Sequence, residues 1–125
     1  MNEIIFDDVL KAILGLKNYI DECIVKIRNH QSLLDRNQTK LFYYISEFYI
    51  FVHNNIFKVE PDMVLVRNYF PILKNIYIDL NSLMENLTSH NIELEFPKLN
   101  LFSTNSLYAI EEWIENQPLN LDKNI

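Results

Sequence analysis

One cysteine and three histidines are the side chains of this sequence best suited to nucleophilic or acid–base chemistry. Nucleophilic catalysis needs a base beside the nucleophile. Cys23 falls on an apolar helical stripe, which predicts a buried and unreactive thiol. His30, His53 and His90 lie near the ends of expected helices, where histidines cap carbonyl groups or face solvent. The sequence therefore predicts no catalytic residue, and we do not expect an enzyme.

Metal-binding patterns are also missing from the sequence. A helical di-metal site uses a Glu three residues before a His, but Ile27, Ile50 and Leu87 occupy these positions. There is no His-x-x-x-His pair and no second cysteine, so the usual zinc patterns are absent and no metal is predicted. A minor alternative stays open, in which carboxylates from distant parts of the chain form an unusual catalytic site.

Glycine is nearly absent, since Gly15 is the only one in 125 residues. Loops that cradle phosphates need several glycines, because only glycine lets the backbone approach a phosphate closely. Neither a P-loop nor a dinucleotide-binding turn is therefore expected, and no cofactor is predicted. Small helical RNA-cleaving domains carry an Arg followed, after four to six intervening residues, by a His, and Arg28, Arg36 and Arg67 have no His in that window.

The charges of the chain are divided unevenly along its length. Residues 1–58 contain seven basic and seven acidic residues, whereas residues 59–125 contain four basic and ten acidic ones. The second half thus carries the whole formal net charge of −6. Because nucleic acids are bound by cations that displace counterions from phosphates, we do not expect a nucleic-acid partner. An acidic half instead suits a basic protein partner.

Tyr108 lies among carboxylates in the last expected helix. Glu111, Glu112 and Glu115 share its sector when successive residues are placed 100° apart. Tyrosine is frequent among the residues that dominate interfaces, and carboxylates pair with basic partners. These four residues therefore predict a partner-binding surface, with a solvated helix face as the alternative. Further carboxylates extend this surface if the fold brings them close: Glu93, Glu95, Glu60 and Asp62.

Four or five helices are expected to position these residues. A helix over about 3–30 is indicated by a stripe with helical period, formed by Ile5, Phe6, Val9, Ile13, Leu16, Ile20, Cys23, Ile24 and Ile27. A later helix over about 61–88 opens at Pro61-Asp62 and has its own stripe, formed by Leu65, Tyr69, Ile72, Leu73, Ile76, Leu80, Leu83 and Leu87. Pro71 interrupts that helix, and either one bent helix or two abutting helices would fit.

Residues 38–58 form another expected helix, and its segment 42–57 holds seven of the sixteen aromatic residues. One stripe contains Leu41, Phe42, Ile45, Tyr49, Val52 and Ile56. Tyr44, Phe48 and Phe51 form a second apolar face beside it. A helix that is apolar nearly all round is central in its bundle or offers its extra face to a partner, and we expect burial. The run 48–52 also fits a buried strand, but its length and flanks favour a helix.

Residues 92–96 alternate between apolar and acidic side chains, as in a half-buried strand. A lone strand has no ladder partner, so we expect an extended segment near 92–102 packed on the bundle, or a short hairpin. A last helix over about 104–116 ends before Pro118, with four residues facing inward: Leu107, Ile110, Trp113 and Ile114. The expected fold class is all-α, a single-domain bundle of four or five helices with this short extended segment.

The length of the chain fits one domain over residues 1–125. The N-terminus is acidic where a signal peptide needs positive charge, and no run of about eighteen uncharged apolar residues could span a membrane. A single cysteine cannot form an internal disulfide. We therefore expect a cytoplasmic protein with no membrane contact.

Two functions from different classes remain after these exclusions. The first is a non-enzymatic acidic protein-binding module, an immunity protein or inhibitor that occludes the basic active-site cleft of a nuclease toxin. A phage inhibitor that mimics nucleic acid is a close variant. The second is a structural or regulatory helical subunit of a multiprotein complex that uses the aromatic segment 42–57. A salt-sensitive complex favours the first, and a symmetric apolar contact the second.

Overall fold

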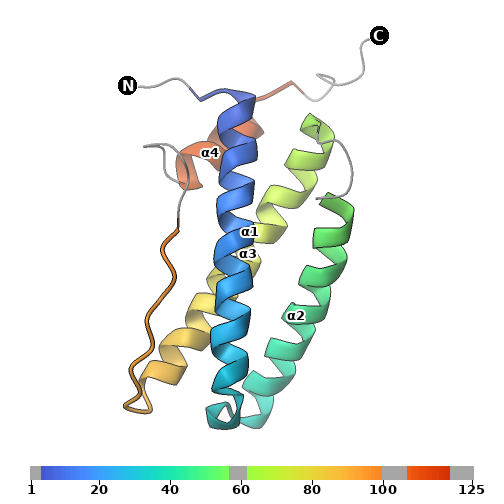
Figure 1. Ribbon diagram of the computed structural model, residues 1–125. Coiled ribbons are helices and arrows are strands. Elements are labelled where there is room, and N and C mark those ends of the chain that lie inside the picture. Colours follow the sequence, from blue (N-terminus) through green and yellow to red (C-terminus); the bar gives the residue numbers. More distant parts are fainter. Residues whose placement is uncertain (1–3, 57–61, 100–106, 119–125) are drawn as a thin grey trace.

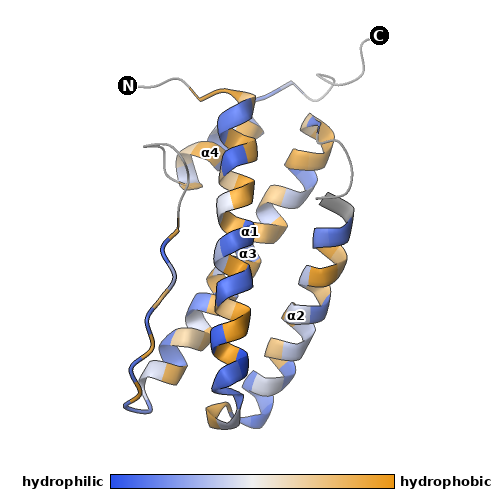
Figure 2. Ribbon diagram, in the orientation of Figure 1, coloured by the Kyte–Doolittle hydropathy of each residue, from blue (hydrophilic) through white to orange (hydrophobic). Residues whose placement is uncertain are grey.

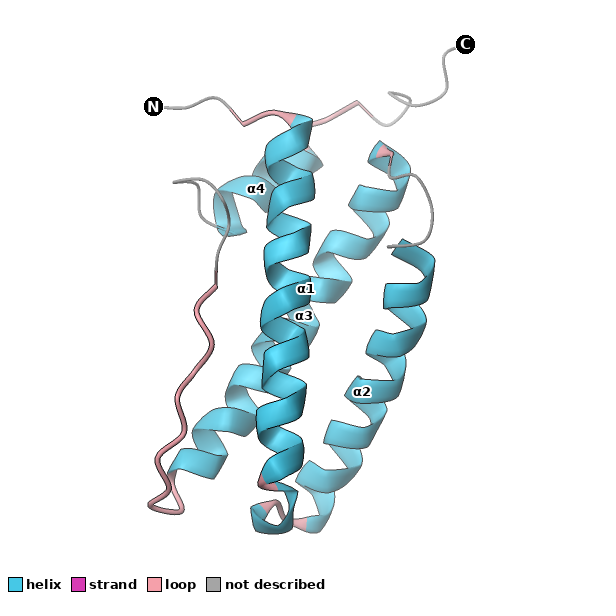
Figure 3. Ribbon diagram, viewed as in Figure 1, coloured by secondary structure: helices cyan, strands magenta, loops and turns pink. Residues whose placement is uncertain are grey.

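Four α-helices make up most of the chain in the computed structural model, which describes residues 4–56, 62–99 and 107–118. They are α1 (Phe6–Asn29), α2 (Arg36–Ile56), α3 (Met63–Thr88) and α4 (Leu107–Glu115), with a short 3-10 turn at Gln31–Leu33. The first three run up and down beside one another, and α4 lies beside α3 near the N-terminal end of α1 (Figure 1). The described residues contain no strand (Figure 3), which confirms an all-α bundle.

Charges at both ends stabilise α1. The carboxylate of Asp8 accepts a hydrogen bond of 3.0 Å from the amide of Ile5, the residue before the helix. The helix dipole is stabilised by acidic residues in the first turn, Asp7 and Asp8, and by basic residues in the last, Lys26 and Arg28. The bounds of α1, Phe6–Asn29, confirm the predicted helix over about 3–30 in the described residues.

A capping box starts α2 two residues earlier than the sequence predicted. The amide of Gln38 donates to Oδ1 of Asp35 at 2.8 Å, and the amide of Asp35 donates to Oε1 of Gln38 at 2.9 Å. These reciprocal bonds satisfy amides that have no partner inside the helix. The strand that residues 48–52 could have formed is replaced by continuous helix.

α3 is one continuous helix through Pro71, so the alternative of two abutting helices is wrong. Asp62 caps its start by accepting a 2.8 Å hydrogen bond from the amide of Leu65. The ring of Pro71 is exposed, so the position costs the helix one hydrogen bond without placing a polar gap in the core.

α3 is also the helix at the centre of the contacts. It packs against α1, α2 and α4 in turn, and its contact with α1 is the most extensive. Apolar faces of the helices turn toward this shared interior (Figure 2). The largest fully buried side chains come from α1, α2, α3 and α4: Phe42, Phe70, Leu16, Ile20, Ile27, Leu73, Leu80, Leu83, Met84, Leu87, Ile110 and Val9.

The predicted burial of the second apolar face of α2 is wrong. Tyr44 and Phe51 are 67% and 59% exposed, and Phe48 is only partly buried. The reason is the position of α2, which lies on the outside of the bundle and packs mainly against α3. One buried face, with Phe42 and Tyr49, is enough to hold an outer helix in place.

Residues 92–99 are extended and run from the C-terminal end of α3 back along the bundle toward α4 (Figure 1). Ile92, Leu94 and Leu99 pack against the core, while Glu93 and Glu95 face solvent. The predicted extended segment is confirmed for these residues. The rest of the range, up to residue 102, lies outside the described residues.

Candidate interaction surfaces

The only thiol of the chain is fully buried. Cys23 has no exposed surface, and burial raises the pKa of its thiol to about 12. Reactive cysteines need the opposite, an accessible thiol with a lowered pKa. This arrangement confirms that Cys23 belongs to the core.

A polar network ties α1 to α2. The hydroxyl of Tyr49 donates to Oδ1 of Asp21 at 2.8 Å and lies 3.3 Å from the carbonyl oxygen of Lys17. Nζ of Lys17 lies 2.9 Å from Oδ2 of the same carboxylate. Burial, followed by the hydrogen bond to Asp21, raises the pKa of the Tyr49 hydroxyl. The hydroxyl therefore stays protonated, and the network holds helices together rather than acting as a base.

A second tyrosine ties α1 to α3. The hydroxyl of Tyr19 donates to Oδ1 of Asn81, and its ring meets that of Tyr77 edge to face at 5.0 Å. Burial raises the pKa of this hydroxyl as well. Tyr19 and Tyr49 thus attach α1 to both long neighbours at one level of the bundle.

Two cations on α3 hold α4. Nη2 of Arg67 donates to the carbonyl oxygen of Ile114, in the last turn of α4, and to that of Gln117, just beyond the helix, at 3.2 and 2.7 Å. Nζ of Lys74 lies 2.6 Å from Oε1 of Glu111. Ile110 and Ile114 complete the attachment, because both are buried against the core.

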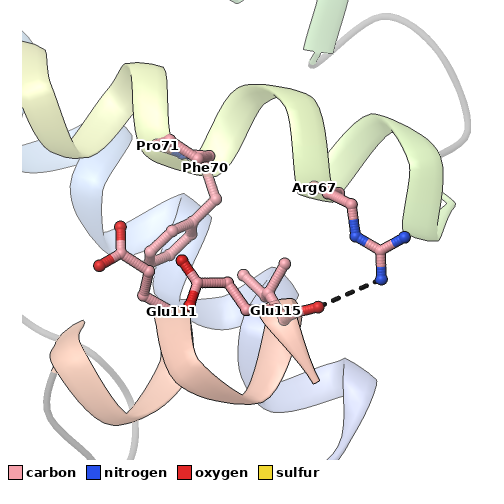
Figure 4. Close-up of a pocket in the computed structure, with 6 residues that line it drawn as sticks. Arg67, Phe70, Pro71, Glu111 and Glu115 are labelled. Carbon is pink, nitrogen blue, oxygen red and sulfur yellow. Dashed lines mark hydrogen bonds between the residues drawn. The ribbon is translucent and has the colours of Figure 1, made fainter. Parts of the chain in front are cut away.

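A pocket of about 300 Å³ lies between α3 and α4 (Figure 4). Its lining residues are Arg67, Phe70, Pro71, Glu111, Ile114 and Glu115. The guanidinium already binds backbone carbonyls, and Glu111 is paired with Lys74. Two of the three charged lining groups therefore serve the attachment of α4.

The exposed side of α4 carries Tyr108, Glu112 and Glu115, which we name the α4 acidic face; Glu115 lies at its edge, where it also lines the pocket against α3. The ring of Tyr108 is 72% exposed, and both carboxylates are exposed. Positions 108, 112 and 115 share one side of a helix. Glu111 differs from them, because it is half-buried against α3 and paired with Lys74. Leu107 and Trp113 pack on the core, as predicted.

The other predicted carboxylates that the structure describes lie on elements other than α4. Glu93 and Glu95 are exposed on the extended segment, which lies along the bundle while α4 lies near one end (Figure 1). Asp62 caps α3, and Glu60 lies outside the described residues. The structure thus places Tyr108, Glu112 and Glu115 together and puts Glu93 and Glu95 on another element.

A second surface, underestimated from the sequence, follows the outside of α2. Leu41, Tyr44, Phe48 and Phe51 recur at intervals of three and four residues and so share one face, which we name the α2 apolar stripe. Leu41 is exposed like Tyr44 and Phe51. The rings of Tyr44 and Phe48 stack with their centroids 6.1 Å apart and their planes 15° apart. The result is a four-residue apolar surface with two parallel rings at its middle.

Among residues 4–56, 62–99 and 107–118, no three His, Cys, Asp or Glu side chains are grouped to hold a metal ion. In the same part of the chain, the helices are too short or too polar to cross a membrane. Comparison with protein-family models, with curated proteins and with solved structures gives no match to this chain.

Proposed function

We propose that this chain is a non-enzymatic protein-binding module that binds a basic partner through the α4 acidic face. In its specific form, it is an immunity protein or inhibitor that covers the basic cleft of a nuclease toxin. Tyr108 carries the proposal, because it is the most exposed large apolar side chain of the described residues and has two outward carboxylates beside it.

Three observations support this proposal. Tyrosine anchors and a rim of charges are typical of protein interfaces. The half of the chain that contains α4 carries all of the formal net charge of −6, which attracts basic proteins at long range. α4 is clamped by Arg67 and Lys74, so its outward face is presented on a fixed element.

The experiment asks whether this chain binds and neutralises the protein encoded by the adjacent gene, because toxin and immunity genes commonly lie together. Co-expression is expected to relieve its toxicity, and the purified proteins are expected to associate more slowly as salt rises. Glu112→Lys with Glu115→Lys should slow association further. Glu22→Lys with Glu85→Lys, exposed carboxylates on α1 and α3, is the matched control. Equal effects of both pairs, or indifference to salt, would contradict the proposal.

The second candidate is a structural or regulatory helical subunit that uses the aromatic segment 42–57. The exposure of the α2 apolar stripe favours it, because apolar patches of several hundred Å² are often functional. Both candidates are protein-binding roles, but they use different helices. Substitutions on α4 and on α2 therefore separate them.

A further inference from the structure

The α2 apolar stripe differs from a scatter of surface hydrophobic residues in its regularity. Its members, Leu41, Tyr44, Phe48 and Phe51, follow the alternating three- and four-residue spacing with which one helix packs along another. Ile45 and Val52 follow Tyr44 and Phe51 in sequence and are buried. The stripe therefore borders directly on the core of the bundle, and a helix laid on it would extend that core.

We propose that the α2 apolar stripe pairs with the same stripe of a second copy of this chain, with the two α2 helices antiparallel about a two-fold axis. This inference rests on the second candidate function and names its partner. It is independent of the α4 acidic face.

The positions of the stripe are complementary to themselves. A two-fold interface requires that if residue i faces residue j, then j also faces i. An axis between Tyr44 and Phe48 places Tyr44 against Phe48 of the other copy and Leu41 against its Phe51. Every apolar side chain then meets another apolar one. The stacked rings of Tyr44 and Phe48 lie at the centre, so four rings would meet at the axis.

The charge of the surroundings also favours a second copy. Two chains with a net charge of −6 repel each other, but residues 1–58 contain equal numbers of acidic and basic residues. The stripe contains no charged residue, and its solvent side carries Lys40 and Glu47, one charge of each sign. The surroundings of the stripe on α2 therefore add no net charge to the repulsion between copies.

The area of the stripe fits a reversible dimer. A covered aromatic side chain buries about 150–250 Å², so the exposed parts of Tyr44 and Phe51 amount to about 100–150 Å² each. With Leu41 and Phe48, the stripe offers roughly 350–400 Å² of apolar surface. This is about half of what each partner buries in an average stable interface. A dimer of this size is weak and reversible, because buried area alone does not set affinity, and we expect it to be populated within the micromolar range.

Sedimentation equilibrium on the purified chain measures this association. Tyr44→Glu with Phe51→Glu is expected to weaken the dimer by more than about tenfold, because covered anchors each contribute more than about 1 kcal/mol. The matched control is Tyr43→Glu with Ile50→Glu. These side chains are 52% and 58% exposed on the same helix, but they lie off the stripe. Circular dichroism confirms that each variant keeps its helices.

Two results would overturn the proposal at this stage. One is a wild-type chain that stays monomeric across the micromolar range. The other is an equal weakening of the dimer by both pairs of substitutions, since that would make the association a general property of apolar surface on α2.

Disulfide trapping tests the orientation of the two helices. Leu41→Cys and Phe51→Cys are prepared as separate variants and mixed under oxidising conditions. Antiparallel pairing is expected to give a disulfide mainly between the two different variants, because a disulfide requires Cα atoms closer than about 7 Å. The native Cys23 does not compete, since it is buried. Efficient cross-linking of either variant with itself would show parallel pairing and overturn the proposed arrangement.

Discussion

Lys74 and Glu111 form an ion pair of 2.6 Å between α3 and α4, with side chains only 26% and 22% exposed. A pair this sheltered loses more on disruption than a surface pair, because the remaining charge keeps few water contacts. We expect Lys74→Ala to lower the free energy of unfolding by about 1–3 kcal/mol, measured by urea denaturation. Lys11→Ala, which breaks the exposed pair with Asp7, is the control and should cost under about 1 kcal/mol. Equal losses would mean that Glu111 is solvated like Asp7.

The core prediction concerns Ile20 and Ile76, which are buried on the two helices in most extensive contact. Changing either to Ala should cost about 2–5 kcal/mol, since each substitution leaves a cavity. Val25→Ala, at an exposed position of α1, should change the stability by less than about 0.5 kcal/mol. Losses below that value at both Ile20 and Ile76 would place their side chains in solvent.

The capping box at the start of α2 gives a third prediction. Asp35→Ala removes the acceptor of the Gln38 amide and should cost about 1 kcal/mol, seen as a lower midpoint in thermal denaturation. Asp35→Asn is the control, because asparagine also caps helices well. Similar losses for the two variants would indicate that the charge, rather than the cap, matters.

Alkaline pH is expected to destabilise the fold. Burial raises the pKa of the Cys23 thiol from 9.0 to about 12, so the folded state favours the protonated form. The stabilisation is complete below about pH 9 and is lost as the pH rises toward 12. The raised pKa values of Tyr19 and Tyr49 act in the same direction.

Urea midpoints measured across this interval test the contribution of Cys23. Cys23→Ala should flatten the decline between pH 9 and about 12. Ile20→Val is the control, because it leaves a small cavity beside the same helix without removing a titrating group. It should lower the urea midpoint by a similar amount at every pH. If Cys23→Ala leaves the slope unchanged, the thiol does not contribute to it.

If the α4 acidic face binds a basic partner, substitutions of Tyr108 and of the carboxylates are expected to change different rate constants. Tyr108→Ala should speed dissociation, because buried anchors act mainly on the lifetime of a complex. Glu112→Lys with Glu115→Lys should instead slow association and reduce its dependence on salt. Surface plasmon resonance separates the two rates. Unchanged association and dissociation rates for both variants would mean that the α4 acidic face is solvent-exposed surface without a binding role.

The helices could be predicted from the sequence because apolar residues repeat with helical period over long stretches, as from Val9 to Ile27. The start of α2 was missed for a local reason. Asp35 and Gln38 have the spacing of a capping box, but they lie in a polar stretch that has no apolar stripe of helical period.

Burial on α2 could not be predicted, because helical periodicity says which residues share a face and not how many neighbours cover it. Tyr44 and Phe42 are both aromatic, yet only Phe42 meets the core. The same limit applies to Glu111. Its place in sequence groups it with Glu112 and Glu115, and only the position of Lys74 on α3 turns it inward.

The two tyrosine attachments of α1 have a mechanical consequence. Tyr19 bonds to α3, while Tyr49 of α2 bonds to Lys17 and Asp21, all within two turns near the middle of α1. Both sets of bonds lie near the middle of α1, away from the two ends of that helix. Because these bonds hold α1 near its middle, the two ends of this helix are expected to fray before the middle does.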